Sequence, residues 1–76
     1  MPHVIIKLYA GRSEQQKAKL AEDVVKAVMA GAECAERSVS VSIEDIGPAD
    51  WVETVYQPDI LAKQDQLYKK PGYDPL

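Results

Sequence analysis

Two segments of the chain alternate apolar and polar residues, which is the pattern of a β-strand that buries one face. The first, Pro2–Tyr9, is rich in β-branched residues, and the second, Ser38–Ile43, alternates valine or isoleucine with serine. We therefore expect two strands. The residues expected on their buried faces are Val4, Ile6, Leu8, Val39, Val41 and Ile43.

A helix is predicted between the two strands. Ala10-Gly11-Arg12 ends the first strand, and Ser13 followed three residues later by Gln16 forms a capping box, which is typical of a helix N-terminus. Gly31 is expected to end this helix. Its apolar residues recur at intervals of three and four, at Leu20, Ala21, Val24, Val25, Val28 and Met29. The opposite, charged face is expected to carry Lys17, Lys19, Glu22 and Lys26.

A strand, a helix and a second strand form a β-α-β unit, whose right-handed crossover makes the strands parallel. This pattern places the chain in the α/β (α+β) class, as one domain over residues 1–76. The helix covers one face of the sheet only. The other face and both edges stay open, and such edges are normally paired or covered.

The C-terminal part is predicted to be helical. After a turn at Gly47-Pro48, the segment Asp50–Gln57 is weakly helical until Pro58 interrupts it, and a second helix then runs to about Lys70, before Pro71-Gly72. The apolar face of this second helix is expected to carry Ile60, Leu61, Gln64, Leu67 and Tyr68.

The chain is short for a self-contained core. With 76 residues, burial of a single core barely offsets the loss of chain entropy, so small domains usually add a disulfide, a metal or an oligomer interface. One cysteine, Cys34, and one histidine, His3, cannot make an intrachain disulfide or a complete metal site. We therefore expect a homo-oligomer.

The charge balance excludes several classes of partner. A net charge of −3 lacks the basic excess that phosphate backbones require, so no nucleic acid is expected. The apolar run Val4–Ile6 is far too short for a signal peptide or a membrane span, so no membrane contact and a cytoplasmic location are expected. No Gly-rich phosphate-binding loop occurs in the sequence.

Pro2 is the first candidate for chemistry. If Met1 is removed, Pro2 carries a secondary α-amine, a group with a reference pKa of about 7.7–8.0 that an apolar pocket lowers further. Such an amine can serve as a general base near neutral pH. The alternative is structural, because a proline at the start of a strand loses no hydrogen bond there.

Arg12 and Trp51 are the next candidates. Arg12 lies beside the predicted helix N-terminus, where a guanidinium can bind a carboxylate through two hydrogen bonds, although a solvated surface arginine is also common. Trp51, the only tryptophan, is either a core or interface anchor or the wall of a substrate pocket. No catalytic role is assigned to His3 or Cys34, because neither has a partner at a recognisable spacing.

Together these segments resemble the 4-oxalocrotonate tautomerase family over about residues 2–51. The resemblance rests on Met1-Pro2 opening a strand, on the segment Gly11-Arg12-Ser13-Glu14-Gln15-Gln16-Lys17 opening a helix, and on Ser38–Ile46 as the second strand. The remainder, from Gly47 to the closing Lys69-Lys70-Pro71-Gly72-Tyr73, resembles short bacterial members whose C-terminal part is helical rather than a hairpin.

The resemblance implies a β-α-β unit that assembles into dimers or trimers of dimers, and an amino-terminal proline that moves a proton between an enol oxygen and a carbon of a 2-keto acid. By position, Pro2 is the acid and base, Arg12 binds a substrate carboxylate and Trp51 is an aromatic pocket wall. Well-known members carry a second arginine where this chain has Ser40. A substrate with less charge than a dicarboxylate is therefore expected, and a dimer is favoured over a hexamer because the C-terminal hairpin is replaced.

Two classes of function remain open at this point. The first is an enzyme, a cofactor-independent keto–enol tautomerase of a small keto or enol acid such as phenylenolpyruvate or 2-hydroxymuconate, with a hydratase or dehalogenase of the same superfamily as a variant. The second is a non-catalytic oligomeric binding module, motivated by Ser40 and by the amide nitrogen that Pro2 has while Met1 is attached.

Overall fold

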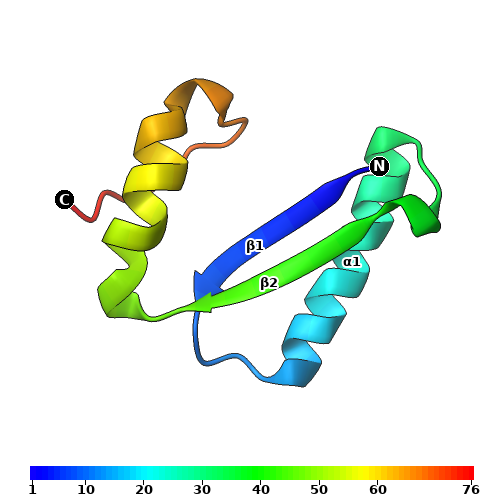
Figure 1. The fold of residues 1–76 in the computed structure, drawn as a ribbon, viewed down its shortest axis with the longest axis horizontal. Helices are drawn as coiled ribbons and strands as arrows, with labels where there is room; N and C mark the ends of the chain where they lie inside the picture. Colours follow the sequence, from blue (N-terminus) through cyan, green and yellow to red (C-terminus); the bar gives the residue numbers. More distant parts are fainter.

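The computed structural model of residues 1–76 consists of a β-α-β unit and a helical C-terminal segment (Figure 1). Strand β1 (His3–Tyr9) leads through a bend into helix α1 (Glu14–Ala32), and the 3₁₀ turn η1 (Glu36–Ser38) connects α1 to strand β2 (Ser40–Ile46). The two strands pair in parallel, with His3 opposite Ser40 and Tyr9 opposite Ile46. The predicted fold class is confirmed.

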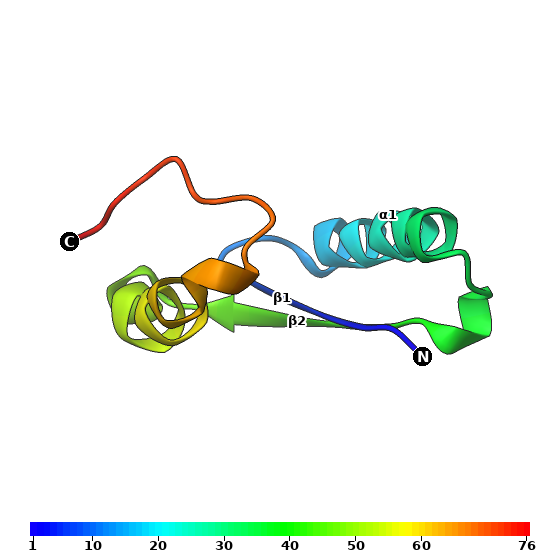
Figure 2. The same ribbon diagram turned by 90° about the horizontal axis from the view of Figure 1, so that it is seen from above.

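The buried faces of the strands follow the alternation in the sequence. Val4, Ile6 and Leu8 are half-buried, and Val41 and Ile43 line one hollow together with residues of α1, which places them on the covered face. Figure 2 shows α1 on one side of the sheet and open space on the other. The alternation therefore sets which face α1 covers.

Helix α1 begins as predicted and ends later. The Ser13 hydroxyl accepts from the Gln16 backbone N–H at 3.0 Å, and the Gln16 side chain accepts from the Ser13 N–H, so both halves of the capping box are present. The prediction that Gly31 ends the helix is wrong. The helix continues to Ala32, and Glu33 takes the left-handed conformation at φ 52°. The backbone N–H groups of Glu33 and Cys34 both donate to the Met29 carbonyl.

Lys17 was expected on the solvent face of the helix, and this expectation is also wrong. Its side chain is 14% exposed, and its ammonium group forms ion pairs of 2.8 Å with both Glu14 and Asp45. Asp45 follows Val41 and Ile43 on the covered face of β2, because alternate residues share a face. The long lysine side chain can therefore lie against the sheet while its charge meets a carboxylate.

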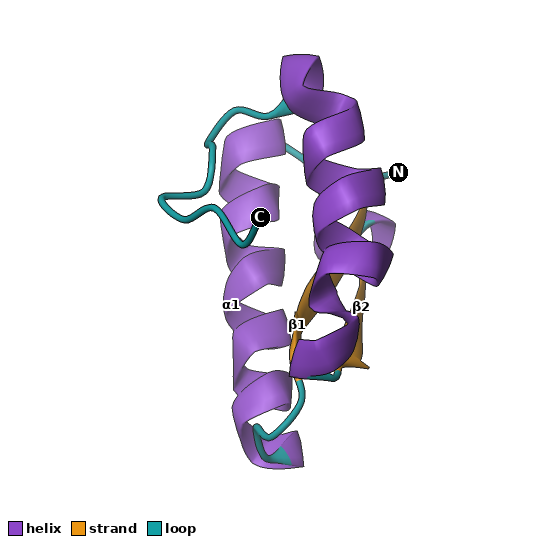
Figure 3. Ribbon diagram, turned by 90° about the vertical axis from the view of Figure 1, so that its left-hand side faces the viewer, coloured by secondary structure: helices purple, strands orange, loops and turns teal.

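The C-terminal segment is helical but differs in detail from the prediction. It consists of a 3₁₀ turn η2 (Pro48–Asp50), a wide π-type helix η3 (Val52–Ile60) and a kinked 3₁₀ stretch η4 (Leu61–Gln66). In Figure 3 it is the unlabelled helix in front of the two strands. Pro58 does not interrupt η3. In a π-type turn the bonding carbonyl is five residues back, so the proline ring meets less crowding from the carbonyl four residues back than in an α-helix.

The predicted second helix also ends early. The chain leaves helical geometry at Lys63 (φ −126°, ψ 32°) and the helical stretch finishes at Gln66, so Lys69 and Lys70 follow it instead of lying in its last turn. Tyr68 is fully exposed rather than part of an apolar face.

Burial is concentrated outside the β-α-β unit. Val55 and Tyr56 of η3 are the two residues of the chain that are buried, whereas Ile5 and Tyr9 on the open face of β1 are 55% and 45% exposed. A single chain thus leaves its sheet without a closed core. No helix is both long enough and apolar enough to cross a membrane.

Candidate active site

Pro2 lies immediately before β1, at the end of the sheet where both strands begin. Its carbonyl oxygen accepts from the Ser40 backbone N–H at 3.2 Å, which ties Pro2 to the start of β2. Pro2 is half-buried and Met1 is fully exposed. The proline nitrogen is an amide while Met1 is attached and becomes a base when Met1 is removed.

Ser40 lies beside Pro2, and its hydroxyl forms a hydrogen bond with the side chain of His3. The Nδ1 atom of His3 and the Ser40 hydroxyl oxygen are 2.7 Å apart, across the first register pair of the sheet. Both side chains are exposed. The structure therefore brings together Pro2, Ser40 and His3, to which no sequence pattern assigned a role.

Arg12 lies at the other end of the sheet, in the bend between β1 and α1. Gly11 has φ +126°, a conformation that favours glycine, and it turns the chain so that Arg12 precedes the helix. The guanidinium is exposed and one of its nitrogens donates to the Tyr9 carbonyl at 3.1 Å. Because arginine has five N–H donors, most remain free for an anion.

Trp51 follows β2 and lies at the same end as Arg12. Its indole N–H donates to the Tyr73 hydroxyl at 2.9 Å, and its ring meets Tyr9 edge to face with the ring centres 5.1 Å apart. These three aromatic residues line a shared hollow. Trp51 is thus held from both sides, by β1 and by the C-terminal tail.

A single chain does not bring all four predicted site residues together. Pro2 precedes β1 and Arg12 follows it, so the seven-residue strand separates them by about 23 Å at roughly 3.3 Å per residue. Figure 1 shows the amino terminus at one end of the strands and the C-terminal helical segment at the other. One half of the predicted site, Pro2 with Ser40, therefore lies far from the other half, Arg12 with Trp51.

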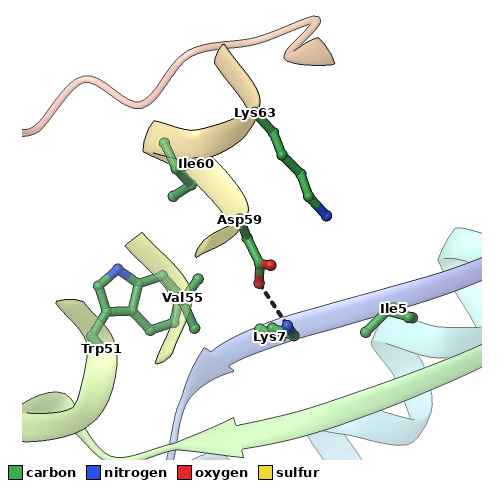
Figure 4. A pocket seen from close by; sticks show the side chains of 7 residues that line it. All are labelled: Ile5, Lys7, Trp51, Val55, Asp59, Ile60 and Lys63. Atoms are coloured by element: carbon green, nitrogen blue, oxygen red, sulfur yellow. Dashed lines mark hydrogen bonds and ion pairs between the residues drawn. The ribbon is translucent and has the colours of Figure 1, made fainter. Parts of the chain in front are cut away.

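The largest groove contains Trp51 and neither Pro2 nor Arg12. It has a volume of about 410 Å³ and lies between the open face of β1 and the C-terminal segment (Figure 4). Its lining residues are Ile5, Lys7, Trp51, Val55, Asp59, Ile60 and Lys63. Three of these residues, Lys7, Asp59 and Lys63, are charged, and no motif in the sequence predicted a role for them.

Two lysines give this groove its charge. Lys7 forms a 2.6 Å ion pair with Asp59, and the hydrogen bond that its ammonium group donates to Asp59 raises the pKa of Lys7 above its usual value. Lys63 has no ion-pair partner, and Figure 4 shows its ammonium group pointing into the groove. With one paired and one unpaired cation, the groove carries a net positive charge beside an indole wall. No three His, Cys, Asp or Glu side chains are placed to hold a metal ion.

Comparison with known proteins assigns the family. The family sequence model described as "Tautomerase enzyme" matches residues 2–55, more than half of the chain. The chain belongs to the tautomerase family. This membership confirms the resemblance to that family and places the chain among enzymes of the isomerase type.

Curated tautomerases match the chain over almost its full length. A protein of Xylella fastidiosa named as a probable tautomerase is 40% identical over 76 residues, which cover all of this chain and 93% of that protein. Tautomerase PptA of Escherichia coli is 35% identical over 74 residues, which cover 96% of this chain and 97% of PptA. The similarity to these relatives therefore includes the C-terminal helical segment.

Solved structures of family members match a smaller share of the chain. TomN, described as a 4-oxalocrotonate tautomerase homologue in the tomaymycin biosynthetic pathway, superposes with a TM-score of 0.64 at 30% identity, covering 66% of this chain and 77% of TomN. YwhB, another homologue of 4-oxalocrotonate tautomerase, has a TM-score of 0.59 at 35% identity, covering 60% of this chain and 75% of YwhB.

Proposed function

We propose that this tautomerase interconverts the enol and keto forms of a small 2-keto acid without a cofactor, using the Pro2 amine as acid and base after loss of Met1. The amine takes the proton from the enol hydroxyl and returns a proton to the neighbouring carbon, so no atom is gained or lost. The observation that carries this proposal is the position of Pro2, half-buried at the edge of a sheet in a chain that belongs to the tautomerase family.

Two structural features support Pro2 as the base. Its carbonyl is held by the Ser40 N–H, so the ring is fixed at the start of the sheet while its nitrogen carries only Met1. Met1 is fully exposed, which leaves it accessible to an aminopeptidase. A secondary amine fixed by its own ring needs little further ordering to meet a substrate.

The complete site requires a second copy of the chain in this proposal. Pro2 and Arg12 lie at opposite ends of a strand, so an antiparallel arrangement of two copies brings Pro2 of one copy to Arg12 and Trp51 of the other. The open sheet face and the small number of buried residues favour such a homo-oligomer, and we propose a dimer. A stable 8 kDa monomer in light scattering at micromolar concentration would contradict this part of the proposal.

Arg12 and Trp51 provide substrate binding in the proposed site. A guanidinium with free donors can hold the carboxylate of a 2-keto acid through two parallel hydrogen bonds. The indole of Trp51, braced by Tyr9 and Tyr73, supplies an apolar wall. Removal of water beside the Pro2 amine favours its neutral form, which is the form that accepts a proton.

The deciding experiment compares the chain with and without Met1. Protein whose N-terminus is shown by mass spectrometry to be Pro2 should accelerate ketonisation of phenylenolpyruvate or 2-hydroxymuconate, whereas a form that keeps one residue before Pro2 should be inactive. A Pro2→Ala variant should lose most of the rate, because its primary amine is more mobile and differs in basicity. Full activity in the Met1-retaining form would exclude Pro2 as the base.

A further inference from the structure

His3 and Ser40 form a side-chain pair beside Pro2, on the sheet face that α1 leaves open. The two residues are direct register partners, and the Nδ1 and hydroxyl oxygen atoms are 2.7 Å apart. The backbone adds two links, because His3 follows Pro2 and the Ser40 N–H donates to the Pro2 carbonyl. His3 is the only histidine of the chain.

The number of hydrogens in this pair determines what it can offer a ligand. A neutral imidazole has one N–H and serine has one O–H, so the pair holds two polar hydrogens and its internal hydrogen bond uses one of them. If serine donates to Nδ1, the Nε2–H of His3 is free, and if Nδ1–H donates to serine, the serine O–H is free. In either tautomer a single neutral donor remains available beside Pro2.

We propose that the His3–Ser40 pair donates this hydrogen bond to the carbonyl or enol oxygen of a substrate bound at Pro2. The inference rests on the proposed function, because it supplies a donor at the oxygen that exchanges its proton with Pro2. In this role the pair also determines which substrates are preferred. A neutral donor suits a carbonyl oxygen, whereas a second carboxylate would leave most of its charge unpaired when it loses water.

A purely structural role explains less of this arrangement. Both side chains are exposed, so their hydrogen bond competes with water and contributes little to folding. Ser42 is a matched neighbour, since it lies two residues further along the same face of β2 and forms no side-chain hydrogen bond. Ser42→Ala is therefore the control for loss of a serine hydroxyl on this strand face.

The kinetic test uses Met1-free protein and phenylenolpyruvate. We expect Ser40→Ala and His3→Phe each to lower kcat about tenfold or more with a smaller change in KM. Each variant keeps one donor but loses the 2.7 Å contact that orients it, and a donor to the reacting oxygen acts mainly in the transition state, where its position matters most. His3→Asn, which keeps a donor, should recover part of the loss, and Ser42→Ala should stay near wild type. Because the pair acts as one donor, the double variant should lose little more than either single variant.

A second measurement needs no variant. In untagged protein labelled with nitrogen-15, the single histidine gives one pair of imidazole signals, and addition of phenylpyruvate should shift them. Unmoved imidazole signals at saturating phenylpyruvate would overturn the inference, as would full activity of Ser40→Ala and His3→Phe or losses that add up independently in the double variant.

The outcomes separate this inference from the proposed function. If wild type is active and depends on Pro2 while the His3 and Ser40 variants match Ser42→Ala, only the inference is wrong. If Met1-free wild type does not accelerate ketonisation of phenylenolpyruvate or 2-hydroxymuconate, the proposed function is wrong and the inference is wrong with it.

Discussion

Lys7 of β1 and Asp59 of η3 form an ion pair of 2.6 Å that links the sheet to the C-terminal helical segment (Figure 4). The two side chains are 27% and 29% exposed, so the pair is partly shielded from water. The same carboxylate lies on the rim of the groove that contains Trp51. The pair therefore determines how the C-terminal segment sits beside the proposed pocket wall.

Loss of this ion pair should loosen the C-terminal segment without unfolding the β-α-β unit. We expect Asp59→Asn to shift the Trp51 fluorescence toward that of a more hydrated indole and to lower the urea midpoint slightly, since partly exposed ion pairs contribute modestly to stability. The control is Glu22→Gln, which removes the exposed pair with Lys26 on α1. Equal fluorescence in the two variants would show that Asp59 does not hold the segment.

The stability of the folded chain should fall at alkaline pH because of groups in this same region. The hydrogen bond that Lys7 donates to Asp59 raises the pKa of Lys7 above 10.5, and burial raises the pKa of Tyr56 above 10.0. Both groups hold their protons more tightly in the folded chain than in the unfolded chain. Their contribution to the free energy of unfolding is therefore fully present below these reference values and is lost as pH rises through the raised pKa values. Urea midpoints measured from pH 8 to pH 12 should fall above about pH 10.

Tyr56→Phe tests how much the buried phenol contributes to the loss of stability at alkaline pH. Without the phenol, the urea midpoint should fall less steeply above pH 10, because the folded and unfolded states then differ less in the number of protons they bind. Tyr68→Phe is the matched control, since Tyr68 is fully exposed. An alkaline profile of Tyr56→Phe that equals that of the control would show that the buried phenol does not couple folding to pH.

Local sequence signals predicted the local structure well. The capping box of Ser13 and Gln16 is present because both partners lie within one helical turn, and the alternation around Val41 and Ile43 set the covered face. The predictions for Lys17 and Pro58 were wrong for a shared reason. The direction of Lys17 depends on Asp45 in a distant strand, and helix η3 accommodates Pro58 by widening, which spacing in the sequence does not reveal.

The candidate site was predicted in part. Resemblance to the family selected Pro2, Arg12, Ser40 and Trp51, but the sequence did not show that the strand separates Pro2 from Arg12. The His3 contact with Ser40 was also hidden, because it depends on the register of two strands that are 37 residues apart in the chain. Long-range contacts of this kind have no local pattern.

Arg12 should matter for substrate affinity. We expect Arg12→Gln to raise KM by about tenfold to a hundredfold, because charge-assisted hydrogen bonds contribute roughly 1.5–3 kcal/mol and about 1.4 kcal/mol corresponds to a factor of ten. Arg37→Gln, in the exposed turn η1, is the control for loss of one positive charge. The readout is the steady-state KM for phenylenolpyruvate, and an unchanged KM would exclude Arg12 from carboxylate binding.

Mixing of two impaired variants tests whether the site is shared between copies. Pro2→Ala and Arg12→Gln each damage one component, so a mixed dimer still contains one intact combination of Pro2 from one chain and Arg12 from the other. We expect activity to rise toward one quarter of the wild-type value after denaturation and refolding together, since about half of randomly paired dimers are mixed. A mixture no more active than the sum of its parts would place both residues in one chain's site.

Substrate preference should depend on whether the residue at position 40 is neutral, as Ser40 is, or positively charged. The wild-type chain offers Arg12 for one carboxylate and a neutral hydroxyl at Ser40, so the second charge of 2-hydroxymuconate would be poorly paired beside Trp51. We expect a higher kcat/KM for phenylenolpyruvate than for 2-hydroxymuconate.

Ser40→Arg should narrow or reverse this ratio, because the guanidinium can pair with the second carboxylate. The same change removes the hydroxyl that lies 2.7 Å from His3 Nδ1, so kcat for phenylenolpyruvate should fall. KM for 2-hydroxymuconate should also fall, because its second carboxylate gains a partner. Ser42→Arg adds the same charge two residues further along the face and serves as the control. A wild-type chain that prefers the dicarboxylate would show that another cation, such as the unpaired Lys63, reaches the substrate from the groove beside Trp51.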